Sequence, residues 1–203
     1  MVYLTQGLLL GGMAAAQPGP FQAYLLSQTL KNGWRRTMWA AFAPLLSDGP
    51  IVILVVLILT QTPDWFLTLL RVAGGGFLLY LAWAAYKTFK TADFTQPVPK
   101  PVKQNIFEAA LMNALNPNPY IFWATVAGPI LIEAWRESPP LGISFVLGFY
   151  GTLIGGFLAF VALFAIARRL DARLNRILSG VSALALLGFG LYQLMIGLQA
   201  LLA

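Results

Sequence analysis

One carboxylic acid, Asp48, lies deep inside an apolar stretch of the chain. It follows Arg36 by 12 residues and precedes Asp64 by 16, and residues 37–60 hold no other charged side chain. Because burial disfavours the charged form, such a carboxyl group can exchange a proton near neutral pH, or stay ionised beside Na⁺ or an ammonium group. We therefore predict that Asp48 couples the binding of an ion to another process. The alternative is a structural aspartate that is only hydrogen-bonded to a neighbouring helix.

Two proline-rich breaks interrupt apolar stretches in the two halves of the chain, Gln17-Pro18-Gly19-Pro20 and Asn116-Pro117-Asn118-Pro119. Proline lacks a backbone N–H and clashes with the preceding turn, so neither segment can continue a regular helix. In hydrocarbon the freed backbone groups need partners, and such breaks survive only where protein or a watery cavity surrounds them. Paired breaks of this kind indicate the substrate site of a transporter.

Polar and aromatic side chains lie beside both breaks. In the fourth predicted span, the spacing of Asn113, Asn116, Tyr120 and Trp123 predicts that they share one helical face. Their depth in the membrane favours a water-filled cavity over a simple contact between helices. Amides at a helix N-terminus suit a carboxylate, whereas unwound carbonyls and an acid suit an ammonium group or a cation. The predicted ion-coupling residue is Asp48, and the predicted substrate-binding residues are Gln17, Pro18, Gly19, Pro20, Tyr24, Asn113, Asn116, Pro117, Asn118, Tyr120 and Trp123.

The composition is that of an integral membrane protein. Of the 203 residues 59% are hydrophobic and only 10% are charged, with a mean hydropathy of +0.74. Four stretches without a charged side chain exceed the roughly 20 residues that span a bilayer. We predict six membrane helices, of which the first and fourth are broken, near residues 3–28, 36–60, 66–88, 106–132, 140–167 and 177–201.

The longest polar stretch, 91–105, contains alternating prolines, which favour an extended connector. It divides a single transmembrane domain, 1–203, into a first repeat, 1–90, and a second repeat, 106–203. Because each repeat has an odd number of helices, the second enters the membrane in the opposite direction. The predicted fold is therefore an all-α integral membrane protein of two inverted three-helix repeats.

The net charge of +6 is distributed unevenly. Of the thirteen basic residues, eleven lie in or beside the predicted first, third and fifth loops, and only Arg71 and Arg136 lie on the other side. The positive-inside rule places those three loops in the cytoplasm and both termini outside. Such clusters are explained by topology and by attraction to anionic lipid, so we expect membrane lipid as a partner and no nucleic acid.

Residue types that the sequence lacks exclude several functions. There is no cysteine and no histidine, which excludes disulfides, thiol redox chemistry and ligation of a metal by these residues. No pairing of a nucleophile with a base is recognisable either. We therefore expect no enzymatic activity, no cofactor and no bound metal.

Small residues at helical spacing predict close packing of helices. Gly7-xxx-Gly11 and Gly151-xxx-Gly155 would let two backbones approach one another. We assign both to contacts within one bundle, and a homo-oligomer interface is the alternative.

Several motifs together resemble the LysE-type (lysine exporter) translocators. They are the Gln-Pro-Gly-Pro of 17–20, Asp48-Gly49, Asn116-Pro117, the aromatic run Leu79-Tyr80-Leu81-Ala82-Trp83 and the stretch from Phe107 to Tyr120. The resemblance covers nearly the whole chain. It implies a six-helix transporter of the bacterial inner membrane that exports amino acids or related small metabolites, driven by an ion gradient. Asn118 stands where many members have lysine, so no member's substrate is transferred to this chain.

The function that we expect is secondary active export by alternating access, as antiport with H⁺ or Na⁺. An inorganic-ion transporter that moves metal cations is the first alternative, although a single intramembrane acid without histidine or cysteine argues against a transition-metal site. A membrane enzyme and a scaffold with a vestigial site are the others.

Overall fold

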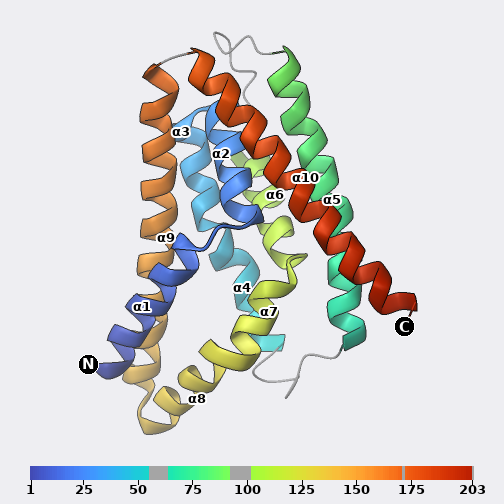
Figure 1. Cartoon of the computed structure of the whole chain (residues 1–203). Helices are drawn as coiled ribbons and strands as arrows, with labels where there is room; N and C mark the ends of the chain where they lie inside the picture. The colour runs from blue at the N-terminus through green and yellow to red at the C-terminus, as the bar shows by residue number, and fades with distance from the viewer. Residues whose placement is uncertain (55–63, 92–101, 171, 203) are drawn as a thin grey trace.

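The computed structural model describes residues 1–54, 64–91, 102–170 and 172–202. In these ranges the chain is helical except for short connections (Figure 1). The first half contains α1 (Val2–Ala16), α2 (Pro20–Asn32), α3 (Trp34–Thr37), the 3₁₀ segment η1 (Met38–Phe42), α4 (Ala43–Ile53) and α5 (Asp64–Thr91). The second half contains α6 (Val102–Ala114), α7 (Pro117–Phe122), the π-helical segment η3 (Trp123–Ala127), α8 (Gly128–Glu137), α9 (Pro139–Leu170) and α10 (Ala172–Leu202).

Both predicted helix breaks are confirmed. After α1 ends, Gln17 (φ −67°, ψ 120°) and Gly19 (φ −164°, ψ −178°) are extended, and α2 starts at Pro20. After α6 ends, Asn116 is extended (φ −84°, ψ 125°) and α7 starts at Pro117. Proline fits the first position of a helix because its missing N–H has no intrahelical acceptor there.

Among the described residues, three helices are long and apolar enough to cross a membrane: Asp64–Lys87, Pro139–Ile166 and Arg176–Leu201. They coincide with the predicted third, fifth and sixth spans. The first and fourth predicted spans consist of shorter helices, and residues 55–60 of the second lie outside the described residues. The six-span inverted repeat stays a prediction, as does the connector, of which residues 92–101 are not described.

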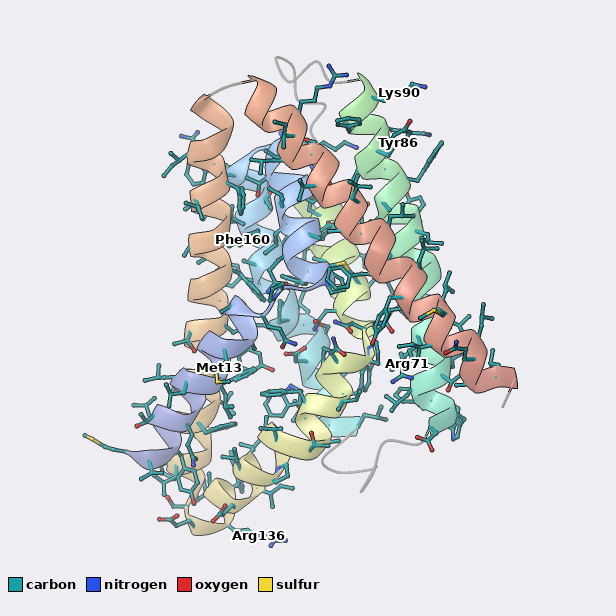
Figure 2. All side chains as sticks on the ribbon, viewed as in Figure 1. Met13, Arg71, Tyr86, Lys90, Arg136 and Phe160 are labelled. Atoms are coloured by element: carbon teal, nitrogen blue, oxygen red, sulfur yellow. The ribbon has the colours of Figure 1, made fainter. Side chains whose placement is uncertain are left out.

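The helices pack around α2, which is buried along almost its whole length. It contacts α9 on one side, α10 on another and α6 on a third, while α1 lies along α9 and α5 lies along α10 (Figure 1). Both termini lie toward the same end of the bundle in this view. Figure 2 shows Lys90 at the end of the bundle opposite to Arg136.

The predicted glycine contacts have different outcomes. A Cβ atom on Gly7 or Gly11 of α1 would overlap backbone atoms of Phe145 or Phe149, so this pair does allow α1 to approach α9 closely. The prediction for Gly151 and Gly155 is wrong, because no described atom lies within 4 Å of a Cβ built at either residue. Both are exposed on α9, whereas the backbone of α1 contacts that helix at Phe145 and Phe149.

Candidate functional site

Asp48 of α4 is 4% exposed and accepts hydrogen bonds from three uncharged donors. Asn113 Nδ2 lies 2.6 Å from its Oδ1, and the Tyr150 hydroxyl lies 3.2 Å from its Oδ2. The side chain of Trp123 also hydrogen-bonds this carboxylate. Donors on α6, η3 and α9 therefore meet at one acid, and all three belong to the second half of the chain.

Asn113 joins α6 to α4 by two hydrogen bonds. Its Nδ2 atom also donates to Ser47 Oγ at 2.8 Å, and Ser47 Oγ donates to the Ala43 carbonyl at 3.2 Å. An ionised carboxylate can only accept, whereas a protonated one must also donate. A change in the charge of Asp48 therefore changes the hydrogen bonds between α4 and the second half.

Aromatic rings cover the Asp48 site. The Trp123 side chain is 1% exposed, with ring-centroid distances of 5.5 Å to Phe149 and 6.4 Å to Tyr150. This packing fixes the orientation of the indole that faces the acid. Because the rings exclude water, hydrogen bonds to the carboxylate are stronger here than they would be in solvent.

At the second break, nearby side chains hydrogen-bond the backbone groups that the break leaves free. The Tyr120 hydroxyl donates to the Ala114 carbonyl at 2.8 Å, and Asn116 Oδ1 accepts from the Asn118 N–H at 3.1 Å. Pro117 and Pro119 have no N–H, so the start of α7 offers little to an anion. The break is nevertheless stable in apolar surroundings, because the freed groups find partners.

The first break leaves more backbone amides available. The Gln22 side chain donates to the Ala15 carbonyl at 3.1 Å and bridges α1 to α2. No side chain caps α2. The N–H groups of Phe21 and Gln22 lie in its first turn, where no intrahelical acceptor exists. Of the two breaks, this one is better suited to a carboxylate.

The two breaks meet at a small cavity of about 10 Å³. Such a volume is about what a single water needs. Pro20 from the first break and Asn116 from the second both line it, together with residues of α5, α6 and α10: Gly74, Leu78, Met112, Leu115 and Gln193. Both breaks thus border one cavity, which shares no lining residue with the hydrogen-bond partners of Asp48.

Tyr24 belongs to a different group of side chains, the α2–α6 polar cluster: Tyr24, Gln28, Asn32, Asn105 and Glu108. The Tyr24 hydroxyl lies 3.0 Å from the Asn105 carbonyl and 3.3 Å from Glu108 Oε2. Asn32 Nδ2 donates to Gln28 Oε1 and lies 3.4 Å from Asn105 Oδ1. All five residues are buried. This cluster holds α2 against α6 on the side of the breaks nearer Lys31.

A larger apolar cavity of about 430 Å³ lies between α4 and α6. Its walls include Leu46, Ile51 and Leu111, and its polar members Ser47 and Tyr120 already donate to backbone carbonyls. The cavity therefore offers no hydroxyl hydrogen that is free to bind a polar ligand.

The structure brings together only part of the predicted site. Asn113 and Trp123 contact Asp48, and Tyr120 lies within electrostatic range of it. Pro20 and Asn116 share the small cavity, with Gly19 and Pro117 next to them in the chain. Three predicted residues are exposed: Gln17, Pro18 and Asn118.

Sequence reasoning missed several residues at these sites, among them Ser47, Glu108, Tyr150 and Gln193. A usable signal existed for two of them, because Tyr150 and Gln193 are polar side chains in the middle of uncharged stretches, where such residues are often functional. Ser47 directly precedes Asp48. Glu108 lies at the edge of a predicted span, and only its burial marks it out.

The family model for LysE type translocators matches residues 13–197. The match includes both breaks, Asp48 and the three donors that hold it. No curated protein and no solved structure matched the chain. Nine-tenths of the chain is covered by the match, and the chain belongs to the LysE-type translocators, a family of membrane transport proteins.

Proposed function

We propose that the protein is a secondary active exporter of amino acids or related small metabolites, an antiporter with H⁺ or Na⁺ in the bacterial inner membrane. The observation that carries this proposal is the Asp48 site. The acid lies in the first half of the chain, and Asn113, Trp123 and Tyr150 all lie in the second half. One ion-dependent group therefore controls contacts between the two halves.

Coupling requires that the ion bind one conformation better than another. An ionised Asp48 accepts the three hydrogen bonds, whereas protonation, or a bound Na⁺, competes with at least one donor. Binding of H⁺ or Na⁺ to the Asp48 carboxylate then changes how firmly α4 is held against α6 and α9. In the proposed mechanism, this change favours one of two conformations, which open the substrate site to opposite sides of the membrane.

The substrate's polar groups are assigned to the breaks. The free amides at the start of α2 suit its carboxylate. Unwound carbonyls at the breaks suit its ammonium group. Asp48, which does not line the cavity at the breaks, is assigned to the ion.

The proposed orientation places the end of the bundle that carries Lys90 in the cytoplasm and both termini outside, with six spans in two inverted repeats. Basic residues concentrated in the first, third and fifth loops support it, because translocation of positively charged loops is disfavoured. The separation of Lys90 from Arg136 agrees with this assignment (Figure 2).

Transport in liposomes tests the proposal with Asp48→Asn, a variant of the same size that cannot ionise. A gradient of one pH unit is equivalent to about 1.4 kcal/mol, so one coupled proton supports about tenfold accumulation of substrate. We expect Asp48→Asn to bind substrate and equilibrate it without accumulation. An exposed acid at the start of α5 supplies the control, since Asp64→Asn should accumulate substrate like the wild type. Undiminished pH- or Na⁺-driven accumulation by Asp48→Asn would contradict the coupling role.

A metal-cation transporter is supported less well by the geometry. In the part of the chain that the structure describes, no three residues among histidine, cysteine, aspartate and glutamate are grouped to hold a metal. Asp48 is a single carboxylate in a chain without histidine or cysteine, whereas a selective transition-metal site needs several such ligands. A flux assay with inorganic cations alone distinguishes the two functions.

A further inference from the structure

Gln193 is a buried amide on the last helix that no part of the Asp48 site uses. It is 8% exposed and lines the small cavity together with Pro20 of the first break and Asn116 of the second. α10 thus contributes a polar side chain at the point where the two breaks meet. The position is reached only because α10 packs against both α2 and α5.

The amides at this cavity lack partners. Asn116 uses its Oδ1 for the Asn118 N–H, and its Nδ2 has no hydrogen-bond partner among the described residues. The Gln193 side chain likewise makes no hydrogen bond to any residue that the structure describes. Asn116 is half-buried and Gln193 is buried, and both line the cavity. Amide groups that border a cavity without a protein partner can hydrogen-bond a polar occupant.

The walls of the cavity carry no ionisable side chain. Neither Asp48 nor Glu108 lines it: Asp48 is held by its three donors, and Glu108 is engaged by Tyr24 in the α2–α6 polar cluster. The breaks supply free amides and carbonyls for the substrate's own carboxylate and ammonium groups, but a further charged side chain at this cavity would lose its hydration without gaining a countercharge. Neutral donors and acceptors are what Asn116 and Gln193 can satisfy.

We propose that Gln193 contacts the transported substrate, and that the substrate is an amino acid or related metabolite whose side chain is uncharged. This inference rests on the proposed function. The Gln193 and Asn116 amides hydrogen-bond the substrate's neutral polar groups when the halves separate and the cavity widens. Substrates with a cationic side chain, such as lysine and arginine, are excluded by the absence of a countercharge at the cavity wall.

Two variants on α10 test whether Gln193 contacts the substrate or only stabilises the structure. Gln193→Leu keeps the size of the side chain and removes both its donor and its acceptor. Gln199→Leu makes the same chemical change at an exposed position six residues further along the helix. Each is purified, reconstituted into liposomes and assayed by counterflow with a panel of labelled amino acids: serine, threonine, glutamine, leucine, lysine, arginine and glutamate. The Tm of each is measured in detergent.

We expect the wild type to exchange neutral amino acids at least tenfold faster than lysine, arginine or glutamate. For the best neutral substrate, Gln193→Leu should raise KM about tenfold, and Gln199→Leu should leave it unchanged. The Tm of Gln193→Leu should equal or exceed that of the wild type, because the variant keeps the size of the side chain and breaks no hydrogen bond to a described residue. A purely structural glutamine would instead lower the Tm on replacement.

Three results would overturn the inference alone: faster exchange of lysine or arginine, an unchanged KM in Gln193→Leu, or a fall in its Tm with no selective effect on KM. If the wild type exchanges no member of the panel, and no member raises its Tm, the proposed function fails as well.

Discussion

Replacing Asn113 with leucine removes the amide that joins α6 to α4 at Asp48. Leucine is close to asparagine in size and cannot donate. The variant loses the 2.6 Å hydrogen bond to Asp48 Oδ1 and the 2.8 Å hydrogen bond to Ser47 Oγ. Asp48 keeps Trp123 and Tyr150 as hydrogen-bond donors, so the variant removes only part of the hydrogen bonding of its carboxylate.

The two lost bonds set the expected magnitude. A hydrogen bond to a charged group contributes about 1.5–3 kcal/mol and a neutral one about 0.5–1.5 kcal/mol. Hydrogen bonds between membrane helices average nearer 0.6 kcal/mol, because the unfolded chain finds other partners in the membrane. We therefore expect a loss of about 2 kcal/mol in the free energy of unfolding. For a chain of this size that corresponds to a fall of about 4–8 °C in Tm.

Thermal unfolding in detergent measures this effect, with Asn118→Leu as the matched control. Asn118 is an exposed asparagine five residues away, and its replacement should change the Tm by less than about 1 °C. The double variant with Asp48→Asn gives the coupling free energy between the two side chains, which we expect to reach about 1 kcal/mol. A Tm for Asn113→Leu within 1 °C of the wild type, or additive effects in the double variant, would refute the reasoning.

Two further predictions concern packing and the second break. Gly11→Ala should destabilise the protein by about 1–3 kcal/mol, because the new Cβ would overlap the Phe149 carbonyl. The control Gly12→Ala should be neutral or slightly stabilising, because a Cβ there meets no described atom within 4 Å. Equal changes in Tm for the two variants would contradict the packing of α1 against α9. Tyr120→Phe should lower the stability by about 1–3 kcal/mol by leaving the Ala114 carbonyl unpaired, as measured by Tm, and an unchanged value would show that another group replaces the hydroxyl.

The helix breaks were predictable because the property that causes them is covalent. Pro20 and Pro117 lack a backbone donor in any surroundings, and both start a new helix. The depth of Asp48 was predictable for a similar reason, since a long uncharged segment surrounds it. Residue type and spacing are sufficient for such features.

The shared face predicted around the second break was only partly correct. Asn113 and Trp123 both reach Asp48, whereas Asn116 turns toward the small cavity and Tyr120 bonds the Ala114 carbonyl. The prediction assumed one continuous helical phase. The extended conformation at the break and the π-helical segment η3 change that phase, and neither change can be calculated from spacing alone.

The sequence by itself determined that this chain is an apolar helical protein with two interrupted segments and one deep acid, because these properties depend on the chemistry of single residues and their neighbours. Tertiary structure decided which groups meet. Tyr150 reaches Asp48 across 102 positions of the chain, and Gln193 reaches Pro20 and Asn116 through the packing of α10. None of the described donors to Asp48 lines the cavity at the breaks, so the proposed ion and substrate sites are built from different residues. Contacts between distant helices depend on complementary surfaces, and a single sequence does not specify which surfaces are paired.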